Sequence, residues 1–235
     1  MTSTDSRAHW ASWIWPPGMP ELTVVVAGTG TEVGKTWAAA QLIAGLVRAG
    51  ATVAARKPVQ SFGRTDALTD AEVLAEASGE RPEDVCPEHR WLALPMAPPM
   101  AAEALGLPPF TIADLVREME LPDDGLGVIE GVGGPRSPLA GDGDTVSLTA
   151  AIEADLVVLV ARPSLGTINS VLLSVEAFRA RPVVVFLNRY DPLDDLHRAN
   201  AAWLRDREGV NVITRPEELV WKVITKTLRR EGPQP

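Results

Sequence analysis

Residues 28–36 read GTGTEVGKT and join an apolar run to a helical pattern. Glycine-rich backbone can wrap an anion with inward-pointing amide groups, and the start of a following helix adds a positive dipole. Lys35 is expected to reach the terminal phosphates of a nucleotide, and the Thr36 hydroxyl to reach a Mg²⁺ ion. The strict phosphate-loop pattern requires glycine where Thr29 stands, so the spacing is a variant. The alternative is a glycine-rich turn that carries GKT by chance.

Other polar side chains follow further apolar runs. They are Lys57 and Ser61 in KPVQS, Glu130 before a second glycine cluster, and Asn188 after PVVVFL. A buried carboxylate such as Glu130 is costly unless it is paired, which favours a functional role. The alternatives are a solvated lysine at position 57 and a simple turn at Asn188.

Apolar runs that alternate with helical patterns must position these residues. We expect strands over 22–28, 52–56, 125–130, 156–161, 182–187 and 210–213. We expect helices over 35–49, 70–78, 101–105, 112–119, 148–154, 167–179, 195–207 and 216–229, and a long loop over 80–100. This order predicts an α/β fold, a doubly wound and mostly parallel sheet of the P-loop NTPase type, in a single domain. Because parallel strands end at one edge, the polar residues should meet there.

Residues 21–235 form the predicted phosphate-loop domain, and residues 1–20 form an arm before it. The arm carries Trp10, Trp13 and Trp15, which are either interface anchors or a cover for the domain itself. The chain has 235 residues, a formal net charge of -9 and one cysteine. These values argue against a nucleic-acid surface and exclude an internal disulfide. No apolar run reaches the length of a membrane span, so we expect a cytoplasmic protein.

Several motifs together resemble dethiobiotin synthetase, the ATP-dependent enzyme of biotin synthesis. They are the variant phosphate loop, KPVQS, PMAPPMAAE, EGVGG, SLGTIN and the asparagine at 188, and they span residues 22–192. The resemblance implies a reaction in which CO2 joins a vicinal diamine, 7,8-diaminononanoate, to form a carbamate. The carbamate attacks the γ-phosphate of ATP, and the second amine closes a cyclic urea. Such phosphoryl transfer depends on alignment and charge neutralisation.

The resemblance also implies roles for individual residues. Lys35, Lys57 and Ser61 are the expected catalytic residues, and Lys57 and Ser61 also contact the substrate. Mg²⁺ would be held by Thr36, Asp70 and Glu130. Asp66 is an alternative ligand, and Asp70 could instead cap a helix. The expected ATP-binding residues are Gly30, Thr31, Glu32, Val33, Gly34, Lys35, Thr36, Glu130, Gly133 and Asn188.

A homodimer with a shared active site is also implied. In it, Gly166, Thr167, Ile168 and Asn169 of one subunit would bind the carboxylate tail of the substrate held by the other.

Some residues depart from the family pattern. Phe62 replaces a glycine beside the expected substrate site, Arg136 brings a charge after EGVGG, and residues 212–217 differ. These changes favour two alternatives, another substrate or a catalytically silent relative that binds partners. A third alternative is a switch ATPase of the partition or septum-placing type. Those proteins usually carry a lysine where this chain has Gly30, so the sequence counts against it.

Overall fold

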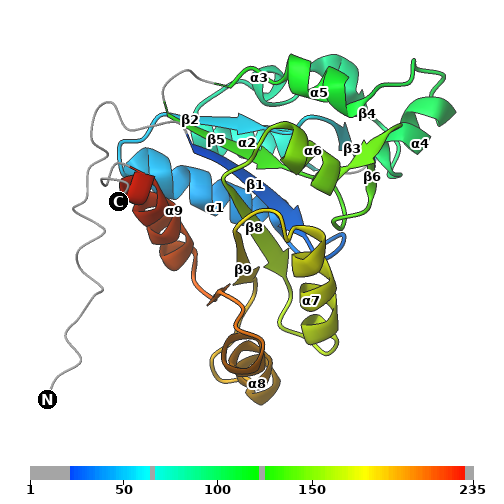
Figure 1. Cartoon of the computed structure of the whole chain (residues 1–235). Helices are drawn as coiled ribbons and strands as arrows, with labels where there is room; N and C mark the ends of the chain where they lie inside the picture. The colour runs from blue at the N-terminus through cyan, green and yellow to red at the C-terminus, as the bar shows by residue number, and fades with distance from the viewer. Residues whose placement is uncertain (1–21, 64–66, 122–124, 231–235) are drawn as a thin grey trace, which may run out of the picture.

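A six-stranded parallel sheet forms the centre of the computed structural model, which describes residues 22–63, 67–121 and 125–230 (Figure 1). All neighbouring strands pair in parallel, and their side chains are buried on both faces. The strand order is β10 (Val212–Ile213), β9 (Val183–Leu187), β8 (Leu156–Ala161), β1 (Leu22–Gly28), β5 (Leu126–Glu130) and β2 (Val53–Arg56).

Alternate residues of the strands face opposite helical layers. Val24 and Val26 of β1 pack in one hydrophobic cluster, whereas Val25 of the same strand packs in another. This alternation follows from the two-residue period of a strand. The first cluster includes residues of α1 (Lys35–Arg48), α2 (Asp70–Ser78) and α9 (Pro216–Arg230). The opposite face is covered by α4 (Pro98–Ala104), α5 (Ile112–Glu118), α6 (Thr145–Ala151), α7 (Thr167–Ala177) and α8 (Asp195–Ala202).

The observed fold confirms the predicted α/β class and the mostly parallel sheet, and the described residues form a single domain. The first strand, the helix over 70–78 and the strand over 156–161 have the predicted bounds. The arm over 1–20 lies outside the described residues. None of the helices in the described part combines the length and the apolar character needed to cross a bilayer.

The predicted loop over 80–100 is wrong, because it contains α3 (Pro82–Val85), a 3₁₀ turn (η2, Glu88–Arg90) and β4 (Trp91–Leu92). Its prolines hid these elements, since Pro82 and Pro98 occupy first helical positions, where no amide hydrogen is needed. As a result, α4 begins three residues before the predicted start. Strand β4 pairs in parallel with β3 (Gln60–Ser61).

Two further predicted helices have different bounds in the structure. A small antiparallel pair, β6 (Pro138–Ala140) and β7 (Gly143–Asp144), precedes α6. Asp144 accepts a hydrogen bond from the Ser147 amide and starts α6 three residues before the predicted position. The predicted helix over 195–207 ends as an α-helix at Ala202 and continues as a π-helical turn, η3 (Trp203–Arg207).

Candidate active site

The glycine-rich loop connects β1 to α1 at the switch point of the sheet, where the chain leaves β1 for β2 and later returns to β8. Gly34 adopts a left-handed conformation with φ 94°, and a side chain there would collide with the Asn188 amide. Glu32 is also left-handed, with φ 55°. The Lys35 ammonium donates to the Gly30 carbonyl at 3.0 Å. Such a loop at a helix N-terminus is suited to bind phosphate.

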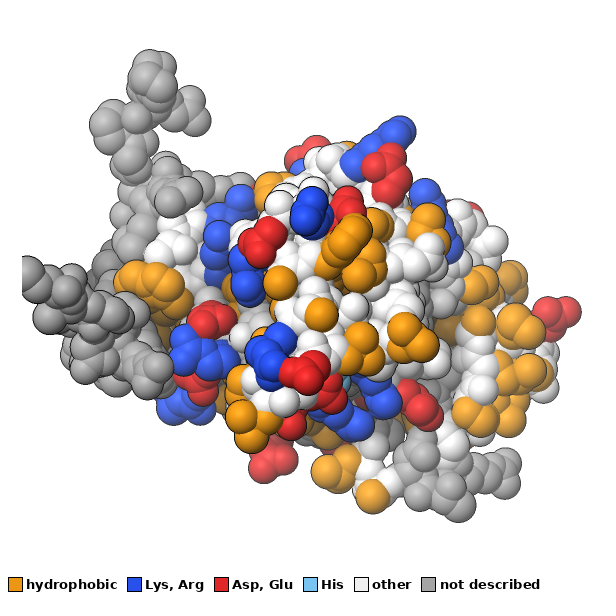
Figure 2. Space-filling view, turned by 90° about the horizontal axis from the view of Figure 1, so that it is seen from below, with side chains coloured by type: hydrophobic (Ala, Val, Ile, Leu, Met, Phe, Trp, Pro, Cys, Tyr) orange, Lys and Arg blue, Asp and Glu red, His pale blue; other side chains and the backbone are white. Residues whose placement is uncertain are grey.

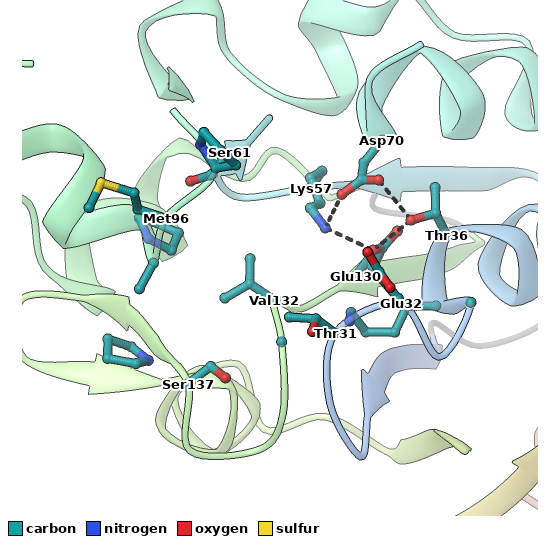
Figure 3. Close-up of a pocket in the computed structure, with 17 residues that line it drawn as sticks. Thr31, Glu32, Thr36, Lys57, Ser61, Asp70, Met96, Glu130, Val132 and Ser137 are labelled. Atoms are coloured by element: carbon teal, nitrogen blue, oxygen red, sulfur yellow. Dashed lines mark hydrogen bonds and ion pairs between the residues drawn. The ribbon is translucent and has the colours of Figure 1, made fainter. Parts of the chain in front are cut away.

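An ion cluster joins the ends of three elements beside this loop, with Lys57 and Glu130 buried and Asp70 38% exposed (Figure 3). The Lys57 ammonium lies 2.7 Å from Asp70 Oδ2 and 2.8 Å from Glu130 Oε1, and it donates to the Gly131 carbonyl at 3.1 Å. The Lys57 and Glu130 side chains are only 2% and 1% exposed. All three ammonium donors are thus engaged, so the solvated lysine considered at position 57 is excluded.

Burial and neighbouring charges shift the pKa of each member of the site. Burial lowers the pKa of Lys35, and the charge of Lys57 lowers it further. Burial alone would lower the pKa of Lys57, but Asp70 and Glu130 outweigh it, and this pKa lies above its ordinary value. Burial alone would raise the pKa of Asp70, but Lys57 outweighs it and the pKa is lowered. Complete burial raises the pKa of Glu130.

Asp70 opens α2 but does not cap it. Thr69 is the N-cap, and its hydroxyl accepts from the Glu72 amide while the Glu72 carboxylate accepts from the Thr69 amide. Thr69 and Glu72 thus form the capping hydrogen bonds at the N-terminus of α2, so the capping role considered for Asp70 is excluded. The Asp70 side chain instead accepts from Thr36 at 2.8 Å and pairs with Lys57.

The three expected Mg²⁺ ligands converge on one point. Thr36 Oγ1 lies 2.8 Å from Asp70 Oδ1 and 3.0 Å from Glu130 Oε1. One hydroxyl hydrogen cannot serve both carboxylates, and Glu130 Oε2 is buried without a hydrogen-bond partner among the described residues. A hard cation would satisfy these oxygens, and a hydroxyl with two carboxylates suits Mg²⁺. The alternative ligand, Asp66, lies outside the described residues.

A cavity of about 650 Å³ opens in front of this cluster. Ser61 lines it, and the buried Ser61 hydroxyl has no hydrogen-bond partner in the described part of the chain. Residues that the sequence did not predict complete the wall. They include Pro95, Met96, Ala97, Pro98, Val132, Ser137 and Pro138. Apolar and polar groups on facing walls suit an organic substrate.

The two unusual residues near the site do not belong to the described lining of this cavity. The Phe62 ring packs edge-on against Trp91, with ring centroids 6.4 Å apart. The Arg136 guanidinium pairs with Asp144 at 3.1 Å and is 68% exposed. Neither residue therefore removes space from the cavity or places a charge in it, in contrast to the expectation from sequence.

Not every expected site residue reaches this cavity within one chain. Thr31, Glu32, Gly34 and Gly133 line it, whereas Gly30 and Val33 contribute backbone carbonyls to neighbouring side chains. Residues 166–169 are outside its described lining. There, Gly166 is left-handed with φ 90°, and the Thr167 hydroxyl is buried without a partner among the described residues.

Asn188 binds the phosphate loop directly. Its side-chain amide donates to the Val33 carbonyl at 2.9 Å, and the side chain is almost fully buried. Asn188 therefore does more than form the simple turn considered from the sequence, because its side chain contacts the phosphate loop. Sequence reasoning missed a second such residue, Arg162, whose guanidinium donates twice to the Glu32 carbonyl, at 3.1 and 2.5 Å. Its position after a strand at the ligand edge was the available signal.

Comparisons with known proteins agree with this geometry. A family model described as an AAA domain (AAA_26) matches residues 22–215. The ATP-dependent dethiobiotin synthetase BioD of Haloferax mediterranei is 38% identical over 195 residues, which cover 81% of this chain and 82% of that protein. The protein of the same name from Anaeromyxobacter dehalogenans is 38% identical over 199 residues, which cover 80% of this chain and 87% of that protein.

Among solved structures, a putative plasmid partition protein from Borrelia burgdorferi bound to AMPPNP superposes with a TM-score of 0.50 and 12% identity. The match covers 90% of this chain and 99% of that protein. This likeness concerns the fold alone and agrees with a phosphate-loop α/β architecture. Sequence relatives and a site that brings the family's motifs together support a closer assignment. The chain belongs to the dethiobiotin synthetase family.

Proposed function

We propose that this protein catalyses the ATP- and Mg²⁺-dependent closure of a cyclic urea from 7,8-diaminononanoate and CO2, the dethiobiotin-forming step of biotin synthesis. The observation that carries the proposal is the convergence of Lys35, Lys57, Thr36, Asp70 and Glu130 on one cavity. Two ammonium groups and two carboxylates beside a phosphate loop are the groups that phosphoryl transfer to a carbamate requires.

The two lysines have different tasks in this proposal. Lys35 lies in the first turn of α1 with its ammonium against the loop, where it neutralises the terminal phosphates. Lys57 lines the same cavity, and its ammonium, fixed in place by Asp70 and Glu130, supplies positive charge beside the carbamate and the γ-phosphate. A preorganised cation stabilises developing negative charge without reorganisation during the reaction.

Thr36, Asp70 and Glu130 would hold Mg²⁺, which supplies charge neutralisation for the phosphate oxygens when bound. Ser61 accepts or donates a hydrogen bond at the substrate nitrogen or the carbamate, since the residue lines the cavity (Figure 3) and its hydroxyl has no hydrogen-bond partner among the described residues. The Met96 and Val132 side chains line the same cavity and offer apolar contact to the methylene chain of the diamine.

A homodimer would complete the site. Residues 166–169 start α7, and the Thr167 amide there donates to the Ser164 carbonyl at 3.1 Å. The Ile168 and Asn169 amides have no backbone acceptor among the described residues, and they suit the carboxylate end of a substrate held by a second copy. Leu165 and Leu173 beside them are 87% and 67% exposed. Figure 2 views this side of the molecule and shows hydrophobic side chains among charges of both signs. Such a surface suits contact between copies.

The test is to incubate the protein with ATP, Mg²⁺, bicarbonate and the diamine, and to search for the cyclic urea by mass spectrometry. We expect the product in the complete mixture, and none after chelation of Mg²⁺ or in K57A. Arg179→Ala is a suitable control, because Arg179 is exposed and pairs only with Glu176 among the described residues. Diamine-dependent phosphate release without the urea would reject this function.

A further inference from the structure

Trp37 is an exposed aromatic residue directly after the phosphate loop. It follows Thr36 in the first turn of α1 and is 47% exposed, although the next two residues of the helix, Ala38 and Ala39, are buried. Its ring stacks on Phe186 of β9, with ring centroids 6.3 Å apart and an angle of 17° between the planes. Phe186 is itself 1% exposed, so the indole rests on a fixed support.

The strand order fixes the direction in which the sugar and base of a bound nucleotide extend away from the phosphate loop. Lys57 follows β2 and Glu130 ends β5, so the groups for the γ-phosphate lie on one side of β1. Strand β9 lies on the opposite side of β1, beyond β8. A triphosphate cradled by the loop and directed toward Lys57 therefore sends its sugar and base toward β9. Trp37 lies on that side because it contacts Phe186.

Asn188 directly follows β9, two residues after Phe186, and donates to the Val33 carbonyl. The same strand thus supports both the loop and the indole. We propose that the exposed face of Trp37 stacks on the purine base of the nucleotide and sets the affinity of this protein for ATP. The inference rests on the proposed use of ATP, but it is independent of the reaction that follows.

Stacking on an indole depends on the π-face of the base and not on phosphate. Alanine substitution of such an aromatic costs about 1–3 kcal/mol per base, which corresponds to about 5- to 150-fold in affinity. Inorganic tripolyphosphate carries the phosphate chain without a base, so it separates the two contributions. Trp221 is a matched control, because it is 42% exposed on α9 and away from the loop in sequence.

The experiment measures the affinity of the full-length protein for Mg-ATP and Mg-tripolyphosphate by calorimetry in the wild type, W37A, W37F and W221A. We expect W37A to bind ATP about tenfold more weakly and tripolyphosphate within about twofold of the wild type. W37F keeps most of the ATP affinity, and W221A is unchanged. Circular dichroism and sedimentation of each variant confirm its fold and oligomeric state.

Unchanged ATP affinity in W37A would overturn the inference. An equal loss of affinity for ATP and for tripolyphosphate, with or without a change in oligomeric state, would also overturn it. The indole would then support the loop or a subunit contact. A wild type that binds neither ligand rejects both the indole site and the proposed function. A base-specific loss in a protein that forms no cyclic urea upholds the indole site and rejects only the reaction.

Discussion

The Lys57 ammonium lies 2.8 Å from Glu130 Oε1, although the two residues are 73 positions apart in the sequence, and both side chains are buried. Removal of one partner from such a pair leaves a buried charge without compensation. We expect Lys57→Met to lower the free energy of unfolding by about 3 kcal/mol, the lower end of the cost of breaking a buried pair. Urea unfolding at pH 8 measures the change.

The double variant K57M/E130Q distinguishes pairing from a simple loss of packing. Substitutions of two residues in contact give non-additive changes in stability. The double variant should therefore lose less stability than K57M and E130Q lose in sum. Additive losses would contradict the pairing. Exposed Arg179 pairs with Glu176 on the surface, and R179M should change the unfolding free energy by no more than about 0.5 kcal/mol.

The capping box of Thr69 and Glu72 positions Asp70 for its contacts with Thr36 and Lys57. Thr69→Ala should cost about 1 kcal/mol of stability, because the cap is lost. It should also raise the Mg²⁺ concentration for half-maximal ATP hydrolysis or product formation several-fold, since the proposed ligand Asp70 loses its support. Magnesium titrations at saturating ATP measure this second effect.

Thr111 provides the control, because it forms an equivalent capping box with Asp114 on α5, away from the cation ligands. T111A should lose a similar amount of stability with no change in Mg²⁺ dependence. If both variants alter the Mg²⁺ dependence equally, the effect comes from general destabilisation and the proposed role of the cap is wrong.

The sequence predicted the sheet and most of the site because each depends on local signals. The β-branched run before Gly28 and the glycine loop before Lys35 define one strand, one turn and one helix. The position of Lys57 and Glu130 after apolar runs then places them at the same edge. The Thr69–Glu72 spacing was a further local signal of a helix start, and it could have excluded the capping role of Asp70.

Other features depend on contacts between distant segments and could not be predicted. Phe62 turns out to pack on Trp91, which required the pairing of β3 and β4. Arg136 pairs with Asp144 across the β6–β7 turn. Arg162 reaches the Glu32 carbonyl across 130 residues. A sequence pattern shows the type of each side chain but not its distant partner.

Arg162 supports the phosphate loop at its left-handed residue, Glu32. Arg162→Ala removes two donors to one carbonyl, so we expect the dissociation constant for Mg-ATP to rise about threefold to tenfold. The unfolding free energy should change by no more than about 0.5 kcal/mol, because the side chain is exposed. Calorimetry with ATP and urea unfolding measure the two quantities.

Arg162→Lys tests whether the guanidinium fork matters. A lysine keeps the charge but not the two parallel donors, so only part of the ATP affinity should return. Full recovery in R162K would show that charge alone is responsible. An R162A variant with wild-type affinity would exclude a supporting role for this contact.

Cys86 offers a probe of opening motions, because it is the single cysteine of the chain and is fully buried. Burial raises the pKa of its thiol to about 12. A thiol with an ordinary pKa near 8.5–9 is partly ionised at pH 8, whereas this one is almost entirely neutral, and the thiolate is the reactive form. We expect an aromatic disulfide reagent to modify the native protein at least about a thousandfold more slowly than a guanidinium-unfolded sample. The absorbance of the released thiolate measures both rates, and C86S controls for other reactions.

Saturating Mg-ATP should slow this modification further. A ligand that binds only the native state reduces the population of open molecules by the factor 1 + [L]/Kd. At a hundred times Kd, the labelling rate should therefore fall by about a hundredfold if modification requires global opening. A rate that ATP leaves unchanged would mean that Cys86 is exposed by a local motion of α3 and its neighbours, and a native rate close to that of the unfolded chain would contradict the burial of the thiol.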